Sequence, residues 1–90
     1  FNIKLSDESR FDLREANRFY SNISKNLKDK FSLEISNAID RIALNPEHFQ
    51  KRYRDIKIVF TEKFPFGIHY ITEGNTVYIQ RVLHEKRLYK

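Results

Sequence analysis

The sequence predicts an α+β fold in which two helices pack on one face of a mainly antiparallel four-stranded sheet. Apolar residues recur at three- and four-residue spacing in the first half of the chain and at two-residue spacing after Pro46. The chain has 90 residues, 40% of them hydrophobic, with only two glycines and two prolines. These values are typical of one globular domain, which we place at residues 1–90.

The first half is predicted to hold one strand and two helices. Residues 1–5 alternate apolar and polar side chains, as a half-buried strand does. Ser6 begins the first helix, because its hydroxyl can cap free backbone N–H groups. Small polar residues break the helical stripe near Ser24, which can cap a second helix. Asn45 ends that helix, because the residue before a proline disfavours the α conformation.

The second half is predicted to hold three strands, which gives the order β-α-α-β-β-β. Ile56, Ile58 and Phe60 alternate with other residues, and we place these three in the core. Glu73-Gly74-Asn75 reads as a turn, because Gly-Asn tolerates positive φ. The aromatic residues at strand or helix spacing are also expected in the core, with some of the helical ones forming a rim that a partner covers. They are Phe11, Phe19, Tyr20, Phe31, Phe60, Phe64, Phe66 and Tyr70.

Charge is distributed unevenly along the chain. The net charge is +5, and residues 1–45 carry 8 basic and 7 acidic side chains against 9 and 5 in residues 46–90. A basic balance favours anionic partners through long-range attraction. The excess includes a cluster directly before the predicted second strand, with Arg52 and Arg54 at its centre. One interpretation is a working surface for an acidic partner or a nucleic acid; the other is the solvated polar face of a sheet.

Several classes of site are disfavoured by composition. The chain has no cysteine, so it has no disulfide and no thiolate ligand or nucleophile. Its three histidines are scattered and match no metal-binding motif, and we expect neither a metal nor another cofactor. His69 is expected to be a buried structural residue, His48 a solvated one, and His84 either a phosphate donor or an exposed tail residue. No apolar run reaches the ~20 residues needed to span a bilayer.

Three stretches of the sequence resemble the RelE/ParE superfamily, the toxins of bacterial type II toxin–antitoxin pairs. They are LSDESRFDLREANRFYSNIS, AIDRIALNPEHFQKRYRDI and FPFGIHYITEGNTVYIQRVLHEKR. Together these stretches cover nearly the whole chain. Their order and spacing match the family's β-α-α-β-β-β order. The resemblance implies a cytoplasmic protein with a cognate antitoxin, as a homodimer or as a heterotetramer with that antitoxin, and no membrane association.

The family acts in two main ways. RelE-like members cut messenger RNA on the ribosome, whereas ParE-like members act on DNA gyrase and generally lack the ribonuclease residues. Cleavage at a 2′-hydroxyl needs a base, a cation for the phosphate charge and an acid. The family pattern places a lysine at Lys57, but the next expected base falls at Val59 and an expected arginine falls at Gly67.

The sequence therefore favours a ParE-like toxin without catalytic residues, with DNA gyrase as the target that the family implies. The alternatives are a ribosome-dependent messenger RNA endoribonuclease and a degenerate member without toxicity. For the ribonuclease, the candidate residues are Lys57, Arg81, His84, Lys86 and Arg87. For a target-binding surface, they are Arg52, Arg54, Lys57, Arg81, Lys86 and Arg87.

Overall fold

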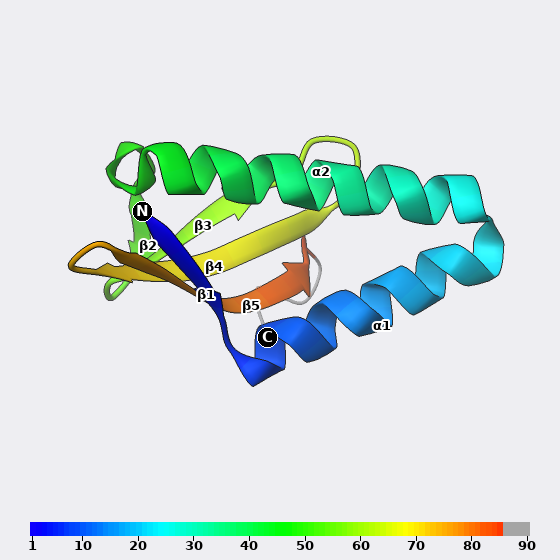
Figure 1. The fold of residues 1–90 in the computed structure, drawn as a ribbon, viewed down its shortest axis with the longest axis horizontal. Coiled ribbons are helices and arrows are strands. Elements are labelled where there is room, and N and C mark those ends of the chain that lie inside the picture. Colours follow the sequence, from blue (N-terminus) through cyan, green and yellow to red (C-terminus); the bar gives the residue numbers. More distant parts are fainter. Residues whose placement is uncertain (86–90) are drawn as a thin grey trace.

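The chain folds as a helical hairpin packed on a curved five-stranded sheet (Figure 1). The structure is a computed structural model that describes residues 1–85. Its elements follow in this order: β1 (Asn2–Leu5), α1 (Asp7–Ile23), α2 (Lys25–Leu44), the 3-10 turn η1 (Pro46–His48), β2 (Lys51–Tyr53), β3 (Ile56–Phe60), β4 (Phe66–Glu73) and β5 (Thr76–His84). The predicted α+β class and the two-helix hairpin are confirmed.

The helix boundaries lie where their capping residues place them. The Ser6 hydroxyl accepts a hydrogen bond from the Ser9 amide at 3.0 Å and so begins α1. Ser24 separates the helices: its amide donates to the Tyr20 carbonyl, and its hydroxyl accepts from the Leu27 amide. One residue therefore satisfies a backbone group of each helix, which fixes the corner of the hairpin without a glycine or proline.

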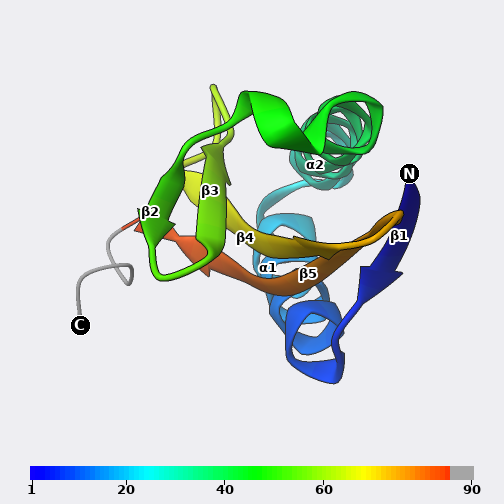
Figure 2. The ribbon, with the colours of Figure 1, turned by 90° about the vertical axis from the view of Figure 1, so that its left-hand side faces the viewer.

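The sheet has one strand more than predicted. Its order is β1-β5-β4-β3-β2, with β1 parallel to β5 and the other pairs antiparallel. The additional strand is β2, three exposed residues that pair with β3. Figure 2 shows β1 and β2 at opposite ends of the curved sheet. Gly74 lies in the β4–β5 turn at φ 57°, so the predicted positive φ is present there.

Both helices pack against the same face of the sheet. Tyr20 of α1 and Phe31 of α2 stack with Phe64 and Phe66, with ring centroids 5.0–6.3 Å apart. The remaining core residues come from both helices and from β3, β4 and β5. They are Ala16, Ile35, Ala38, Ile42, Val59, Ile68, Tyr70, Val77, Ile79 and Val82.

The predicted orientation of β3 is wrong by one residue. Lys57 and Val59 are buried beneath the helices, whereas Ile56, Ile58 and Phe60 are partly exposed on the other face. The register confirms this, because Val59 lies opposite the core residue Ile68. Directly paired residues share a face. The period of two is correct, but the apolar residues expected inside lie on the opposite side of the sheet.

Candidate functional site

The predicted basic cluster lies on the β2–β3 hairpin. Arg52 and Arg54 are exposed, and the Arg52 guanidinium carbon lies 5.7 Å from the centre of the Phe60 ring. Arg54 adopts φ 50°, the left-handed conformation that the tight turn between the strands requires. Lys51 forms a weak ion pair with Asp55 at 3.5 Å. The hairpin therefore presents two arginines at one end of the sheet.

Lys57 does not belong to this exposed cluster. Lys57 is only 5% exposed. Its ammonium donates a hydrogen bond to the Pro46 carbonyl at 3.0 Å and lies 3.5 Å from a Glu47 carboxylate oxygen. The same carbonyl accepts a hydrogen bond from the Tyr70 hydroxyl at 2.7 Å. Burial, with the nearby Glu47 charge, raises the pKa of Tyr70 to about 12. Lys57 thus links the 3-10 turn to the sheet, and its ammonium is not accessible to a ligand.

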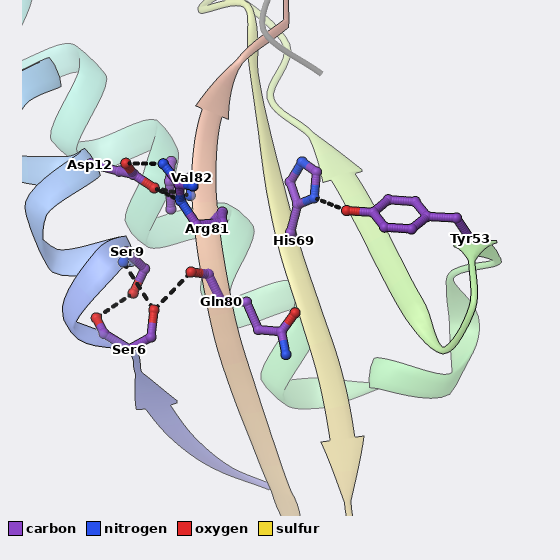
Figure 3. A network of polar contacts seen from close by, with 8 residues as sticks. All are labelled: Ser6, Ser9, Asp12, Tyr53, His69, Gln80, Arg81 and Val82. Atoms are coloured by element: carbon purple, nitrogen blue, oxygen red, sulfur yellow. Dashed lines mark hydrogen bonds and ion pairs between the residues drawn. The ribbon is translucent and has the colours of Figure 1, made fainter. Parts of the chain in front are cut away.

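Arg81 is held by Asp12 of α1. Its Nε and one terminal nitrogen donate to the two carboxylate oxygens at 2.8 and 2.9 Å (Figure 3). The Asp12 carboxylate also accepts from the Val82 amide at 3.0 Å. Hydrogen bonding to Asp12 raises the pKa of Arg81. This bidentate geometry keeps the guanidinium engaged and joins the start of α1 to β5.

His69 lies buried in β4, as predicted, with its imidazole beside Tyr53 of β2. The Tyr53 hydroxyl and His69 Nδ1 are 3.2 Å apart (Figure 3). His69 is 3% exposed, and its Nε2 has no hydrogen-bond partner among residues 1–85. Burial lowers the pKa of His69, and the Arg81 charge lowers it further against a smaller opposing effect of Asp12. The imidazole is therefore favoured in its neutral form.

The other predicted site residues lie at the end of β5 or beyond it. His84 lies opposite Phe66, and the two ring centroids are 5.4 Å apart. Lys86 and Arg87 lie outside the described residues. The structure therefore brings Arg52 and Arg54 together on one hairpin, but Lys57 and Arg81 are engaged in internal contacts away from them.

A groove between α1 and β5 was not predicted. It has a volume of about 340 Å³, and Phe11 and Phe19 of α1 lie along it with Phe66, Val82 and His84. Phe11 and Phe19 are 55% and 61% exposed. The signal was in the sequence: these two phenylalanines lie eight residues apart and off the stripe that α1 buries. Asp12 and Glu15 also line the groove, so its charged side chains are acidic.

The described part of the chain contains neither a metal-binding cluster nor a membrane-spanning helix. Residues 1–85 contain no group of three or more histidine, cysteine, aspartate or glutamate side chains that could hold a metal ion. Neither helix within that range has the length and apolar character needed to cross a membrane. The surfaces that bear on function here are the basic hairpin, the groove and the sheet face that the helices leave uncovered.

Comparison with known proteins identifies the class. A family model described as the ParE toxin of the type II toxin–antitoxin system parDE matches residues 3–89. A solved structure of the chromosomal ParDE toxin–antitoxin system from P. aeruginosa superposes with a TM-score of 0.81 at 16% identity, over 93% of this chain and 95% of that one. No curated protein sequence matches significantly. The fold and the family match define a toxin–antitoxin toxin, and the chain belongs to the ParE toxin family.

Proposed function

We propose that this toxin stops growth by binding a cellular protein, DNA gyrase, and not by cutting RNA. Membership of the ParE family supports a toxin of this class. Gyrase is the target that the resemblance to ParE-like toxins implies. Because gyrase acts in the cytoplasm, the proposed location of the toxin is cytoplasmic.

The burial of Lys57 is the observation that most supports binding over cleavage. A base or phosphate ligand must reach its substrate, and this ammonium is enclosed between the sheet and the 3-10 turn. Val59 faces the helices, and Gly67 has no side chain to donate. Arg81 is already bonded to both oxygens of Asp12. At these positions, β3, β4 and β5 thus offer no free charged side chain of the kind expected of a RelE-like ribonuclease.

The groove beside α1 fits the proposed antitoxin. Phe11, Phe19 and Ile23 recur at eight- and four-residue spacing and are each more than half exposed. Such an apolar stripe accommodates the apolar face of a partner helix. The carboxylates of Asp12 and Glu15 disfavour acidic side chains at that point. We therefore propose that the antitoxin anchors apolar side chains in this groove.

The proposal is tested by titrating purified toxin into a DNA-supercoiling reaction that contains gyrase. We expect supercoiling to fall as the toxin is added, and to recover when the protein encoded beside the toxin gene is present in equimolar amount. Full supercoiling at a large molar excess of folded toxin would reject gyrase as the target. A toxin that inhibits but is not rescued would reject that neighbour as the antitoxin.

A further inference from the structure

The face of the sheet opposite the helices carries a continuous apolar patch. Ile58 lies opposite His69, Phe60 opposite Gly67, and Gly67 opposite Leu83. Because paired residues share a face, these side chains are neighbours across β3, β4 and β5. Ile58, Phe60 and Leu83 are partly exposed and belong to neither the core nor its margin. Among residues 1–85, both helices pack on the other side.

The β2 strand adds an aromatic and basic border to this patch. Tyr53, which is 49% exposed, reaches across β3 to His69, and Arg52 lies over Phe60. We call Arg52, Tyr53, Ile58, Phe60, His69 and Leu83 the open face. Neighbouring apolar side chains on a sheet face that no helix covers, with a polar border, indicate an interaction site.

Charge indicates what this surface can bind. Within residues 1–85, the basic side chains Lys51, Lys57 and Arg81 each have a carboxylate partner. Arg52 and Arg54 have none there. Arginine pairs with carboxylates in bidentate geometry and is favoured at protein interfaces. Two unpaired arginines beside an apolar sheet face therefore match a segment that carries both acidic and apolar side chains.

A buried polar atom beneath the surface gives an independent indication. His69 Nε2 has no hydrogen-bond partner among the described residues, although His69 is 3% exposed. Unpartnered buried polar atoms are uncommon in native proteins and call for an explanation. This atom belongs to the same imidazole whose Nδ1 contacts the Tyr53 hydroxyl on the open face. The open face thus has a buried nitrogen without a hydrogen-bond partner among the described residues, next to apolar side chains that no helix covers.

Building on the function proposed above, we propose that the open face docks an acidic, apolar segment of the toxin's protein target. A nucleic acid fits less well, because affinity for it grows with the number of phosphates that lysine and arginine neutralise. Among residues 1–85, the open face and its hairpin offer two unpaired arginines. The groove beside α1 differs in charge and lies on the helical side. Target and antitoxin anchors thus occupy different surfaces of one small domain.

The test combines growth, antitoxin binding and thermal melting for three double variants. Arg52→Glu with Arg54→Glu reverses the charge of the open face, and Lys25→Glu with Lys30→Glu is the matched control on exposed positions of α2. We expect the first variant to need at least about tenfold more toxin to arrest growth, with melting temperature and antitoxin binding retained. The control should arrest growth as the wild type does. Phe11→Ser with Phe19→Ser should resist rescue by the antitoxin.

The outcomes separate this inference from the choice of target. Growth arrest by the wild type without inhibition of gyrase would reject gyrase, but loss of arrest in the arginine variant would still support the open face. Undiminished arrest in the arginine variant would overturn the inference, as would loss of antitoxin binding by that variant alone. If the wild type binds single-stranded RNA and the arginine variant does not, the inference is overturned in favour of a nucleic-acid ligand. A wild type that never arrests growth would overturn both proposals.

Discussion

At the scale of single residues, burial decides what each predicted charge can do. The stretch Ile56–Phe60 has apolar side chains on both of its faces, and Lys57 is its only polar residue. Local pattern therefore favoured a solvated lysine. The structure instead buries it, because Pro46 and Glu47 provide a carbonyl and a carboxylate from ten or more residues away. A strand pattern predicts alternation, but long-range partners select the face that is buried.

Replacement of Lys57 should destabilise the fold. Lys57→Ala removes the hydrogen bond to the Pro46 carbonyl and the packing of the aliphatic stem, for which we expect a loss of about 1–3 kcal/mol in the free energy of unfolding. Lys57→Met keeps the stem and should lose less. The exposed Lys51→Ala is the control and should change stability by no more than ~0.5 kcal/mol. Urea denaturation measures all three, and equal stability of Lys57→Ala and wild type would contradict the structural role.

His69 should make stability depend on pH. Its pKa in the folded chain lies below the ordinary value of 6.5. Between these two pKa values the unfolded chain binds a proton that the folded chain does not, so stability falls as pH drops below about 6.5 and is complete above it. We expect His69→Gln to lose less stability than wild type between pH 7.5 and 5.5, as measured by urea midpoints. A His69→Gln profile parallel to that of the wild type would refute this.

At the scale of elements, boundaries were predictable and one strand was not. Ser6, Ser24 and Asn45-Pro46 contain local capping or stop signals, and the helices begin and end there. β2 has only three residues, Lys51–Tyr53, all exposed and without apolar alternation, so nothing local marks it as a strand. Its pairing depends on the turn at Arg54 and on Tyr53 reaching His69. The contact of Asp12 with Arg81 joins positions 69 residues apart, which no local pattern reveals.

The connection between α1 and β5 should depend on Asp12. Asp12→Ala removes both hydrogen bonds to Arg81 and leaves the Val82 amide without its acceptor. A part-buried amide that loses its partner costs about 1–3 kcal/mol. Glu15→Ala is the matched control, because Glu15 is an exposed carboxylate of the same helix, paired with Arg18 at 3.1 Å. Its exposed pair should be worth at most ~1 kcal/mol. Equal melting temperatures for the two variants would contradict this ranking.

At the scale of the whole molecule, the sequence predicts the fold and the toxin family better than it predicts which surfaces are free to bind a partner. The order of elements follows from the periodicity of apolar residues and from the capping, turn and proline residues between elements. The match to the ParE family agrees with this order. The surfaces depend on which face of β3 is covered and which arginines find carboxylates. Arg52 and Arg54 have no carboxylate partner among residues 1–85, whereas Lys57 and Arg81 do. Ile58 and Phe60, which were expected inside, lie on the open face.

The most direct test of binding without cleavage is primer extension on translated messages from cells arrested by the toxin. We predict growth arrest with intact messages, because the residues that would act as base and phosphate ligand are buried, engaged or absent in the described part of the sheet. Arg87→Ala provides the control for the ribonuclease hypothesis. Cuts placed regularly within codons that disappear in Arg87→Ala, while the variant stays folded, would contradict the account and establish a ribonuclease.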